Sequence, residues 1–238
     1  MNKTVAYLPT KRARTLAKLS AAIYEQPDEF SALARQIGFS VVDFVDHAGT
    51  QVAHVEGYEF GAIVFRGTQV ASGGSFGERL RDFAFNLRQY PVEWSGPGRV
   101  HSGYLAALGR VRYAANRMVR KSSALKLYIT GHSLGGALAT LNAAEVAWHG
   151  VRKDHHLVTF GAPQAGTEAA LACFGEPSLR ASRYIIEGDP ATIWPLSLTL
   201  EHPCPPIKLP AGGLFSRRHG VSKYVEALTP EAAANAAK

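Results

Sequence analysis

The sequence contains only two cysteines among its 238 residues, Cys173 and Cys204. Two cysteines are too few for a disulfide framework, and neither lies in a spacing typical of metal ligands. Disulfide-rich scaffolds and cysteine-based metal sites are therefore excluded, and we expect neither a metal nor a cofactor. Whether the two cysteines form a single bridge stays open at this point.

Long apolar runs are also missing. No segment approaches the roughly eighteen unbroken apolar residues that a transmembrane helix needs. A basic N-terminus precedes residues 15–24, but Lys18 and Ser20 interrupt that stretch, so the apolar core of a secretory signal is absent. The sequence therefore predicts a protein that is cytoplasmic or is secreted by a non-classical route.

Acidic residues are the minority charge. Against 26 Lys and Arg there are 19 Asp and Glu, which gives a net charge of +7. Such an excess attracts anionic membranes or polymers. The basic residues are spread along the chain with few aromatic residues between them, which argues against a nucleic-acid partner. Oligomeric state stays open.

Helical and strand patterns alternate along a chain that shows no internal repeat. An apolar content of 46% suits a globular protein, and we expect one domain over residues 1–238. Strands are predicted over 39–45, 51–56, 61–65, 127–130, 157–160 and 184–187, and helices over 10–24, 31–36, 79–87, 103–118, 134–150 and 221–228. The proline-rich residues 189–210 are predicted to be irregular. The pattern predicts an α/β fold with a mostly parallel sheet, whose ligand sites lie beyond the carboxyl ends of the strands.

One motif lies at such a strand end. Residues 131–135 read Gly-His-Ser-Leu-Gly, preceded by a β-rich run and followed by small helix formers. This G-x-S-x-G pattern between a strand and a helix is typical of a nucleophile elbow, which exposes a serine at a sharp turn. The alternative is a glycine-rich loop that ends a helix. We expect Ser133 to be the nucleophile.

A serine hydroxyl needs a general base, and the base needs a carboxylate that orients it. In hydrolases with a nucleophile elbow, the acid and then the histidine follow the serine along the chain. Asp189 follows the end of a predicted strand, whereas its rival Asp154 precedes one. Of the two later histidines, His219 lies just before the last helix and His202 lies among prolines. We expect Asp189 and His219 to complete a Ser-His-Asp triad.

Three further motifs resemble the class 3 lipase family, the fungal triacylglycerol lipase type of α/β-hydrolase. Residues 63–68 (IVFRGT) are similar to its apolar strand ending in Arg-Gly-Ser/Thr, residues 101–104 (HSGY) to its His-x-Gly-Phe segment, and residues 159–166 (TFGAPQAG) to its Gly-Ala-Pro turn. The resemblance covers about residues 10–228. It implies an α/β-hydrolase fold, a mostly parallel sheet flanked by helices. The few cysteines and the missing signal make the chain more similar to a bacterial or intracellular member.

The resemblance also implies further parts of the site. The oxyanion hole would consist of Thr68 and Leu134, and Arg66 would be structural and pair with a carboxylate beneath the site. Residues 69–86 would form a lid, the alternative being a helix packed in the core. The expected function is a carboxylic ester hydrolase, a lipase or esterase acting on lipid or acyl-ester substrates and contacting a lipid interface. The alternatives are a phospholipase A1, a non-lipid esterase and a non-catalytic lipid-binding scaffold.

Overall fold

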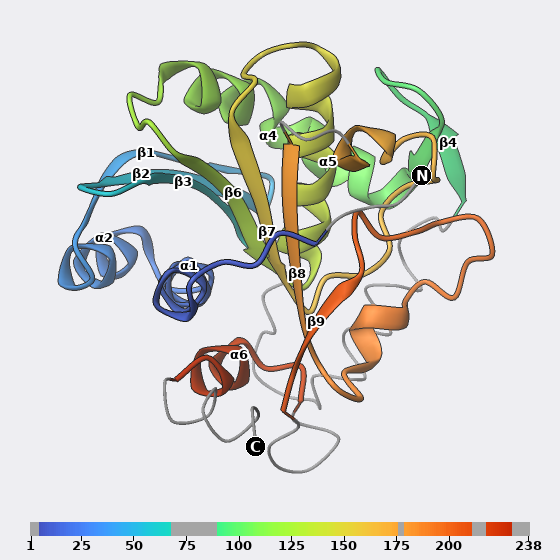
Figure 1. Cartoon of the computed structure of the whole chain (residues 1–238). Helices are drawn as coiled ribbons and strands as arrows, with labels where there is room; N and C mark the ends of the chain where they lie inside the picture. Colours follow the sequence, from blue (N-terminus) through green and yellow to red (C-terminus); the bar gives the residue numbers. More distant parts are fainter. Residues whose placement is uncertain (1–4, 68–89, 176–178, 211–217, 230–238) are drawn as a thin grey trace.

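Within the part of the chain that the structure describes, seven strands form one sheet with helices on both faces (Figure 1). The computed structural model describes residues 5–67, 90–175, 179–210 and 218–229. The strand order is β1-β2-β3-β6-β7-β8-β9, so the later strands are joined by crossovers. The predicted α/β class, with a mostly parallel central sheet, is confirmed.

The first three strands form the predicted meander. β1 (Phe39–His47), β2 (Thr50–Gly57) and β3 (Gly61–Phe65) pair antiparallel. The turn between β1 and β2 contains Gly49 at φ +76°, a conformation that glycine adopts without steric cost.

From β3 onward all neighbouring strands of this sheet are parallel. They are β6 (Leu127–His132), β7 (His155–Phe160), β8 (Leu179–Ile186) and β9 (Pro206–Leu209). Parallel strands buried on both faces are apolar along their length, and β6 is buried from end to end. Their carboxyl ends therefore lie at one common edge of the sheet.

Two hydrophobic cores lie on opposite faces of the sheet. One is covered by α1 (Thr10–Ala22), α2 (Pro27–Gln36) and α6 (Val221–Ala227), the other by α4 (Ser102–Lys121) and α5 (Leu134–Trp148) (Figure 1). α5 is buried on every side from its first residue to Val146, as expected for a helix without a polar face. None of the helices in the described ranges is long and apolar enough to span a membrane.

The sequence-based boundaries differ from the structure in several places, and β8 begins five residues before the predicted 184–187. α2 begins at Pro27, whose fixed φ suits the first helical turn, and Asp28 and Glu29 follow it there. The stretch predicted to be irregular contains the 3-10 turn η2 (Pro190–Ile193) and strand β9. A small hairpin, β4 (Pro91–Glu93) with β5 (Arg99–His101), and the 3-10 turn η1 (Ala172–Gly175) were not predicted. The helix predicted over 79–87 lies outside the described residues.

Strand β1 forms one edge of the described sheet and β9 the other. A register shift between Val41 and Asp43 interrupts the pairing of β1 with β2, and Asp43 forms an ion pair with Arg117. Bulges and charges of this kind prevent an edge strand from pairing with another chain.

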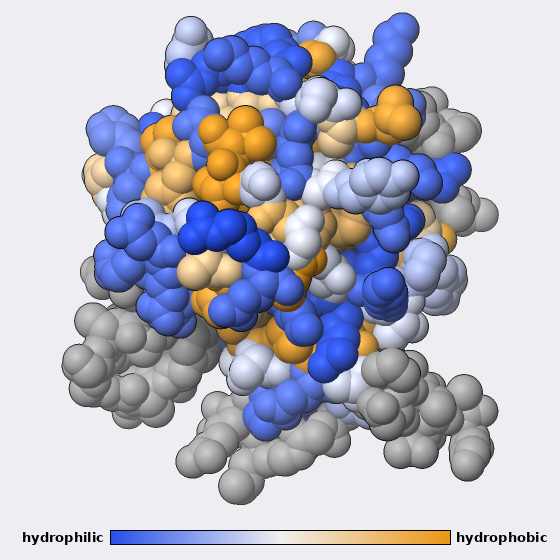
Figure 2. Space-filling model, turned by 90° about the vertical axis from the view of Figure 1, so that its left-hand side faces the viewer, coloured by the Kyte–Doolittle hydropathy of each residue, from blue (hydrophilic) through white to orange (hydrophobic). Residues whose placement is uncertain are grey.

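On the face turned to the viewer in Figure 2, apolar residues lie between strongly hydrophilic ones.

Candidate active site

Ser133 lies at the sharp turn between β6 and α5. Its φ of +57° and ψ of −129° are unusual for a residue with a side chain, and the backbone N–H of Ser133 donates to the carbonyl of Phe160 at 3.0 Å. A non-glycine residue held at such angles costs of order 1–3 kcal/mol and persists only where its surroundings enforce it. The predicted elbow is therefore the observed geometry.

The glycines around Ser133 allow strand, helix and a neighbouring loop to approach each other. A Cβ on Gly131 would overlap the backbone carbonyl group of Gly135. A Cβ on Gly135 would in turn overlap the backbone at Phe65, at the end of β3. Only glycine fits at these contacts, which explains the G-x-S-x-G spacing in steric terms.

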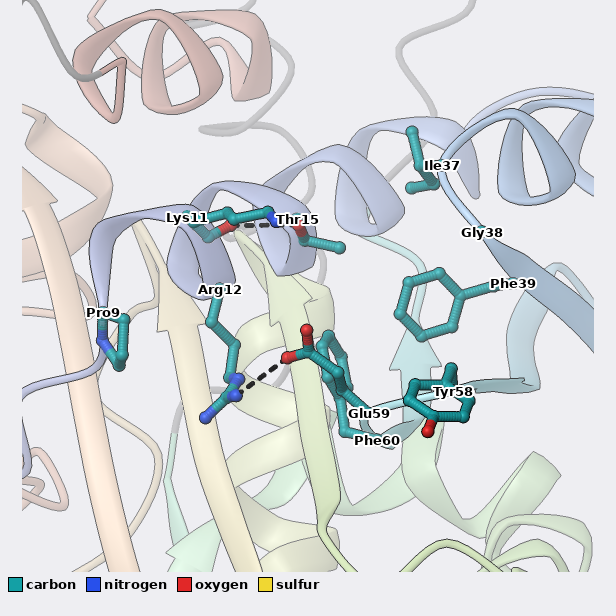
Figure 3. A pocket seen from close by; sticks show the side chains of 10 residues that line it. All are labelled: Pro9, Lys11, Arg12, Thr15, Ile37, Gly38, Phe39, Tyr58, Glu59 and Phe60. Atoms are coloured by element: carbon teal, nitrogen blue, oxygen red, sulfur yellow. Dashed lines mark hydrogen bonds and ion pairs between the residues drawn. The ribbon is translucent and has the colours of Figure 1, made fainter.

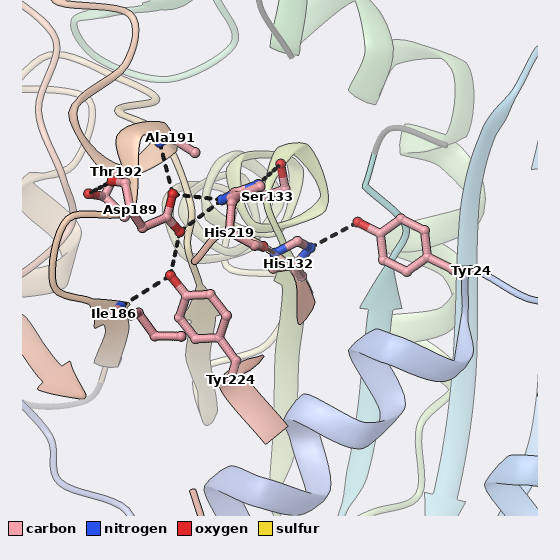
Figure 4. Close-up of polar contacts among 9 residues, drawn as sticks. All are labelled: Tyr24, His132, Ser133, Ile186, Asp189, Ala191, Thr192, His219 and Tyr224. Carbon is pink, nitrogen blue, oxygen red and sulfur yellow. Dashed lines mark hydrogen bonds and ion pairs between the residues drawn. The ribbon is translucent and has the colours of Figure 1, made fainter. Parts of the chain in front are cut away.

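The structure brings Ser133, His219 and Asp189 together at the carboxyl edge of the sheet (Figure 4). His219 Nε2 lies 2.8 Å from Ser133 Oγ, and His219 Nδ1 lies 2.8 Å from both Asp189 oxygens. Ser133, Asp189 and His219 are 1%, 2% and 3% exposed, respectively. Hydrogen bonds shielded from water in this way are stronger than exposed ones.

Asp189 is the N-cap of η2, and three donors surround its carboxylate. Ala191 N–H donates to Oδ1 at 2.9 Å, Tyr224 O–H donates to Oδ2 at 2.5 Å, and His219 Nδ1 contacts both oxygens. Burial alone would raise the pKa of Asp189, but the hydrogen bonds from His219, Tyr224 and Ala191 outweigh it and hold this pKa below its usual value. The carboxylate is therefore ionised at neutral pH.

An ionised Asp189 determines the tautomer of His219. Because a carboxylate can only accept, His219 Nδ1 donates, and the lone pair of the neutral ring is left on Nε2. Nε2 faces Ser133 Oγ, so it can take the hydroxyl proton while the serine attacks an acyl carbon. The arrangement has the geometry that acyl transfer requires.

Leu134 is placed where an oxyanion donor is needed. It is the first residue of α5, directly after Ser133, and an N–H in the first turn of a helix has no intrahelical acceptor. The positive end of the helix dipole adds to this site. Thr68, the other predicted donor, and the predicted lid over 69–86 lie outside the described residues.

The rival acid and the rival base lie elsewhere. Asp154 directly precedes β7 and is therefore at the amino edge of the sheet. His202 Nε2 donates to the carbonyl of Thr192 at 2.8 Å, within the connection that follows β8.

Arg66 differs from its expected pairing. Its Nη1 donates to Gln51 Oε1 at 2.5 Å, and Gln51 Nε2 donates to Asp46 Oδ2 at 2.6 Å. Among the described residues, the guanidinium therefore reaches a carboxylate through an amide, without the direct ion pair that we expected. A neutral amide is a good partner here because Arg66 is only 7% exposed and Gln51 offers both an acceptor and a donor.

A pocket of about 310 Å³ lies near the amino ends of the parallel strands, opposite the edge that carries Ser133 (Figure 3). It is bordered by Arg12, which pairs with Glu59 at 3.0 Å, and by aromatic side chains that include Phe39 and Phe60. Phe60 directly precedes β3, at the amino end of the parallel strands, whereas Ser133 follows the carboxyl end of β6. This pocket is therefore separate from the candidate active site.

Tyr224, His132 and Tyr24 contact the site but were not singled out in the sequence. Tyr224 donates to Asp189, and His132 contacts the backbone of His219 and the hydroxyl of Tyr24. Tyr24 and Tyr224 lie in predicted helices and His132 precedes the predicted serine, and in these places their sequence pattern is that of core residues. The one available signal is that a buried tyrosine hydroxyl needs a hydrogen-bond partner.

Comparison with known proteins identifies the family. The family model described as "Lipase (class 3)" matches residues 62–198, which is more than half of the chain. The chain belongs to the class 3 lipase family. This confirms the resemblance read from the motifs.

Relatives and solved structures agree with this assignment. The chain is 34% identical to secreted mono- and diacylglycerol lipase 1 of Fusarium solani, over 50% of this chain and 36% of that protein. It is 32% identical to lipase ZK262.3 of Caenorhabditis elegans, over 63% of this chain and 45% of the relative. The structure of Rhizomucor miehei lipase with its propeptide is similar in fold, with a TM-score of 0.72 and 21% identity, over 88% of this chain and 73% of that one.

A second fold neighbour is a triacylglycerol lipase in which a serine protease triad forms the catalytic centre. It aligns with a TM-score of 0.69 and 22% identity, over 84% of this chain and 79% of that structure. The α/β-hydrolase fold is thereby confirmed. The chain spans less than half the length of the curated relatives it matches.

Proposed function

We propose that this class 3 lipase hydrolyses carboxylic esters of acyl substrates through an acyl-enzyme on Ser133. The observation that supports this is the hydrogen-bonded series from Asp189 through His219 to Ser133, with His219 in the tautomer that a base requires. Residues 1–238 would act as one catalytic domain, because all three side chains meet at the carboxyl edge of a single sheet.

In the proposed reaction, Ser133 Oγ attacks the ester carbonyl while its proton passes to His219 Nε2. The ester C–O bond then breaks, and His219 delivers that proton to the departing alcohol. Water, deprotonated by His219, attacks the acyl-enzyme, and the carboxylic acid leaves as Ser133 regains its proton. The N–H groups of Leu134 and Thr68 would stabilise the oxyanion in both steps, and one such donor is worth about 10²- to 10³-fold in rate.

Labelling with a fluorophosphonate probe tests the activated serine. Wild type should be labelled, and Ser133→Ala, His219→Ala and Asp189→Ala should each lose ester hydrolysis by about 10³-fold or more. The rivals are matched controls: His202→Ala and Asp154→Ala remove the same residue types outside the triad and should keep most activity. An unlabelled, folded wild type would contradict the proposal and favour the non-catalytic scaffold.

We further propose that the acyl substrate belongs to a lipid, because the relatives are lipases and one is described as a mono- and diacylglycerol lipase. A panel of p-nitrophenyl esters of increasing chain length, acylglycerol emulsions and phosphatidylcholine vesicles tests this. Hydrolysis of acylglycerols supports it. Preference for phosphatidylcholine would indicate a phospholipase A1, and activity on short soluble esters alone would indicate a non-lipid esterase.

The segment after Asp189 supports contact with a lipid interface. Residues 190–200 contain no charged side chain, and Ile193, Leu196 and Leu198 are 60%, 68% and 104% exposed. Leu196 N–H donates to the carbonyl of Ile193 at 3.1 Å, so the turn that presents these side chains is hydrogen-bonded. Exposed apolar groups gathered in one place mark contact sites for apolar partners. We propose that this segment meets lipid beside the triad.

A triple variant with Ile193→Ser, Leu196→Ser and Leu198→Ser tests that contact. Emulsion hydrolysis should fall severalfold, with hydrolysis of a short soluble ester unchanged. Leu125→Ser is the matched control, because Leu125 is 92% exposed but precedes β6 at the amino edge. Equal losses on both kinds of substrate, or no loss on emulsions, would refute the interface.

A further inference from the structure

A series of hydrogen bonds outside the triad ends on the backbone of His219. His132 Nε2 lies 2.7 Å from the carbonyl oxygen of His219, and the Tyr24 hydroxyl lies 3.0 Å from His132 Nδ1 (Figure 4). The backbone at Gly67 lies directly against the Tyr24 oxygen. Four parts of the fold are therefore joined: the end of β3, the turn after α1, the end of β6, and the loop that carries His219.

The direction of each hydrogen bond follows from the chemistry of its partners. A carbonyl can only accept, so His132 Nε2 donates to His219. Burial, with the nearby His219, lowers the pKa of His132 to about 3, so its ring is neutral and Nδ1 accepts from the Tyr24 hydroxyl. Burial likewise raises the pKa of Tyr24, which keeps that hydroxyl proton in place.

The packing leaves this series little freedom. His132 is 2% exposed, and its ring centroid lies 4.7 Å from that of His219. A Cβ on Gly67 would overlap the Tyr24 hydroxyl, so the glycine allows the close approach. The Arg66 guanidinium lies 5.8 Å from the centre of the Tyr24 ring and covers it. Each donor therefore has one defined acceptor.

We propose that Tyr24 and His132 are positioning residues, which hold the His219 backbone and the backbone at Gly67 in register with Ser133. The inference rests on the proposed function. Gly67 directly precedes Thr68, so the same series ties the base to the segment that would supply an oxyanion donor. Displacing a catalytic group by about 1 Å can cost on the order of 10²-fold in rate. Neither residue touches the reacting atoms, so the loss should appear in kcat with KM for a small ester unchanged.

Tyr24→Phe tests the proposal most directly, because it removes one oxygen and keeps the ring. We expect kcat for p-nitrophenyl butyrate to fall about tenfold or more at unchanged KM, and probe labelling to slow by the same factor. Tyr128→Phe is the matched control. Tyr128 is buried on the same strand as His132, four residues away, and its hydroxyl accepts from Arg12 at the amino edge.

Two variants of His132 separate positioning from packing. Gln keeps a donor near the place of Nε2, whereas Leu has none. His132→Gln should therefore retain several times more of the kcat than His132→Leu. If His132→Leu does not fold, Tyr24→Phe decides alone.

Wild-type kcat in folded Tyr24→Phe, or a loss no larger than that of Tyr128→Phe, would overturn the inference. A raised KM with unchanged kcat would overturn it as well. Failure of the proposed function is a separate result, because it would appear as a wild type that the probe does not label.

Discussion

Mild acid should destabilise this protein through its buried histidines. Burial lowers the pKa of His132 and of His156 to about 3 and that of His101 to about 4. In the unfolded chain each histidine titrates near about 6.5. Between these values the unfolded state binds protons that the folded state cannot bind. Stability is therefore complete above about pH 6.5 and is lost as the pH falls toward the folded-state values.

The size of the effect follows from the difference between the two pKa values. From about pH 8 to about pH 5, a histidine that stays neutral in the fold loses roughly 2 kcal/mol of stability relative to its protonated unfolded form. The three histidines together lose about 6 kcal/mol, which is comparable to the whole stability of a typical domain, about 5–15 kcal/mol. The pKa values of His54 and His155 are also lowered by burial and act in the same direction. Asp189 does not contribute in this window because its pKa is lowered from an already acidic value.

Urea unfolding followed by tryptophan fluorescence across this pH range measures the effect. His156→Gln is the informative variant, since His156 Nε2 donates to Ser182 Oγ at 3.0 Å and glutamine keeps an N–H for that contact. The variant should reduce the loss between about pH 8 and about pH 5 by roughly 2 kcal/mol. A wild type whose unfolding free energy changes by less than about 2 kcal/mol over this range would refute the argument.

Three further predictions concern the elbow and the acid. Tyr224→Phe removes a hydrogen bond to a buried carboxylate, so kcat/KM should fall about tenfold in ester assays. An unchanged kcat/KM would show that Tyr224 does not support catalysis. Gly161→Ala places a Cβ 2.8 Å from both Asp189 Oδ2 and the Tyr224 hydroxyl, so it should abolish probe labelling. Gly150→Ala is the control: Gly150 has a similar φ, a Cβ there would meet nothing within 4 Å, and probe labelling should be kept. Ser133→Gly should exceed Ser133→Ala in unfolding free energy by roughly 1 kcal/mol, because glycine relieves the positive φ that alanine keeps; equal values would contradict the strain.

The meeting of Ser133, Asp189 and His219 is predictable from the sequence because each of them follows a feature that leaves a local pattern. Ser133 lies between a β-rich run and small residues, Asp189 follows a strand end, and His219 is one of two histidines left by chain order. Parallel strands bring their carboxyl ends to one edge, so order along the chain translates into proximity in space. The same logic excludes Asp154, which precedes β7.

Other elements left no such pattern. β9 was missed because proline is rare in strands and this segment begins at Pro206; it is tolerated there because β9 is at the edge of the sheet and Pro206 is its first residue. The hairpin of β4 and β5 has only three residues per strand, too few for an alternating pattern to appear.

The sequence by itself determined the α/β class, the nucleophile elbow and the candidate triad, since these follow from periodicity and from the order of residues along the chain. Only the tertiary structure decided which side chains support the triad. Tyr24, His132 and Tyr224 come from three different elements, and their hydrogen bonds join residues between 35 and 108 positions apart. Contacts at such separations depend on how helices pack on the sheet, and no local pattern encodes that packing.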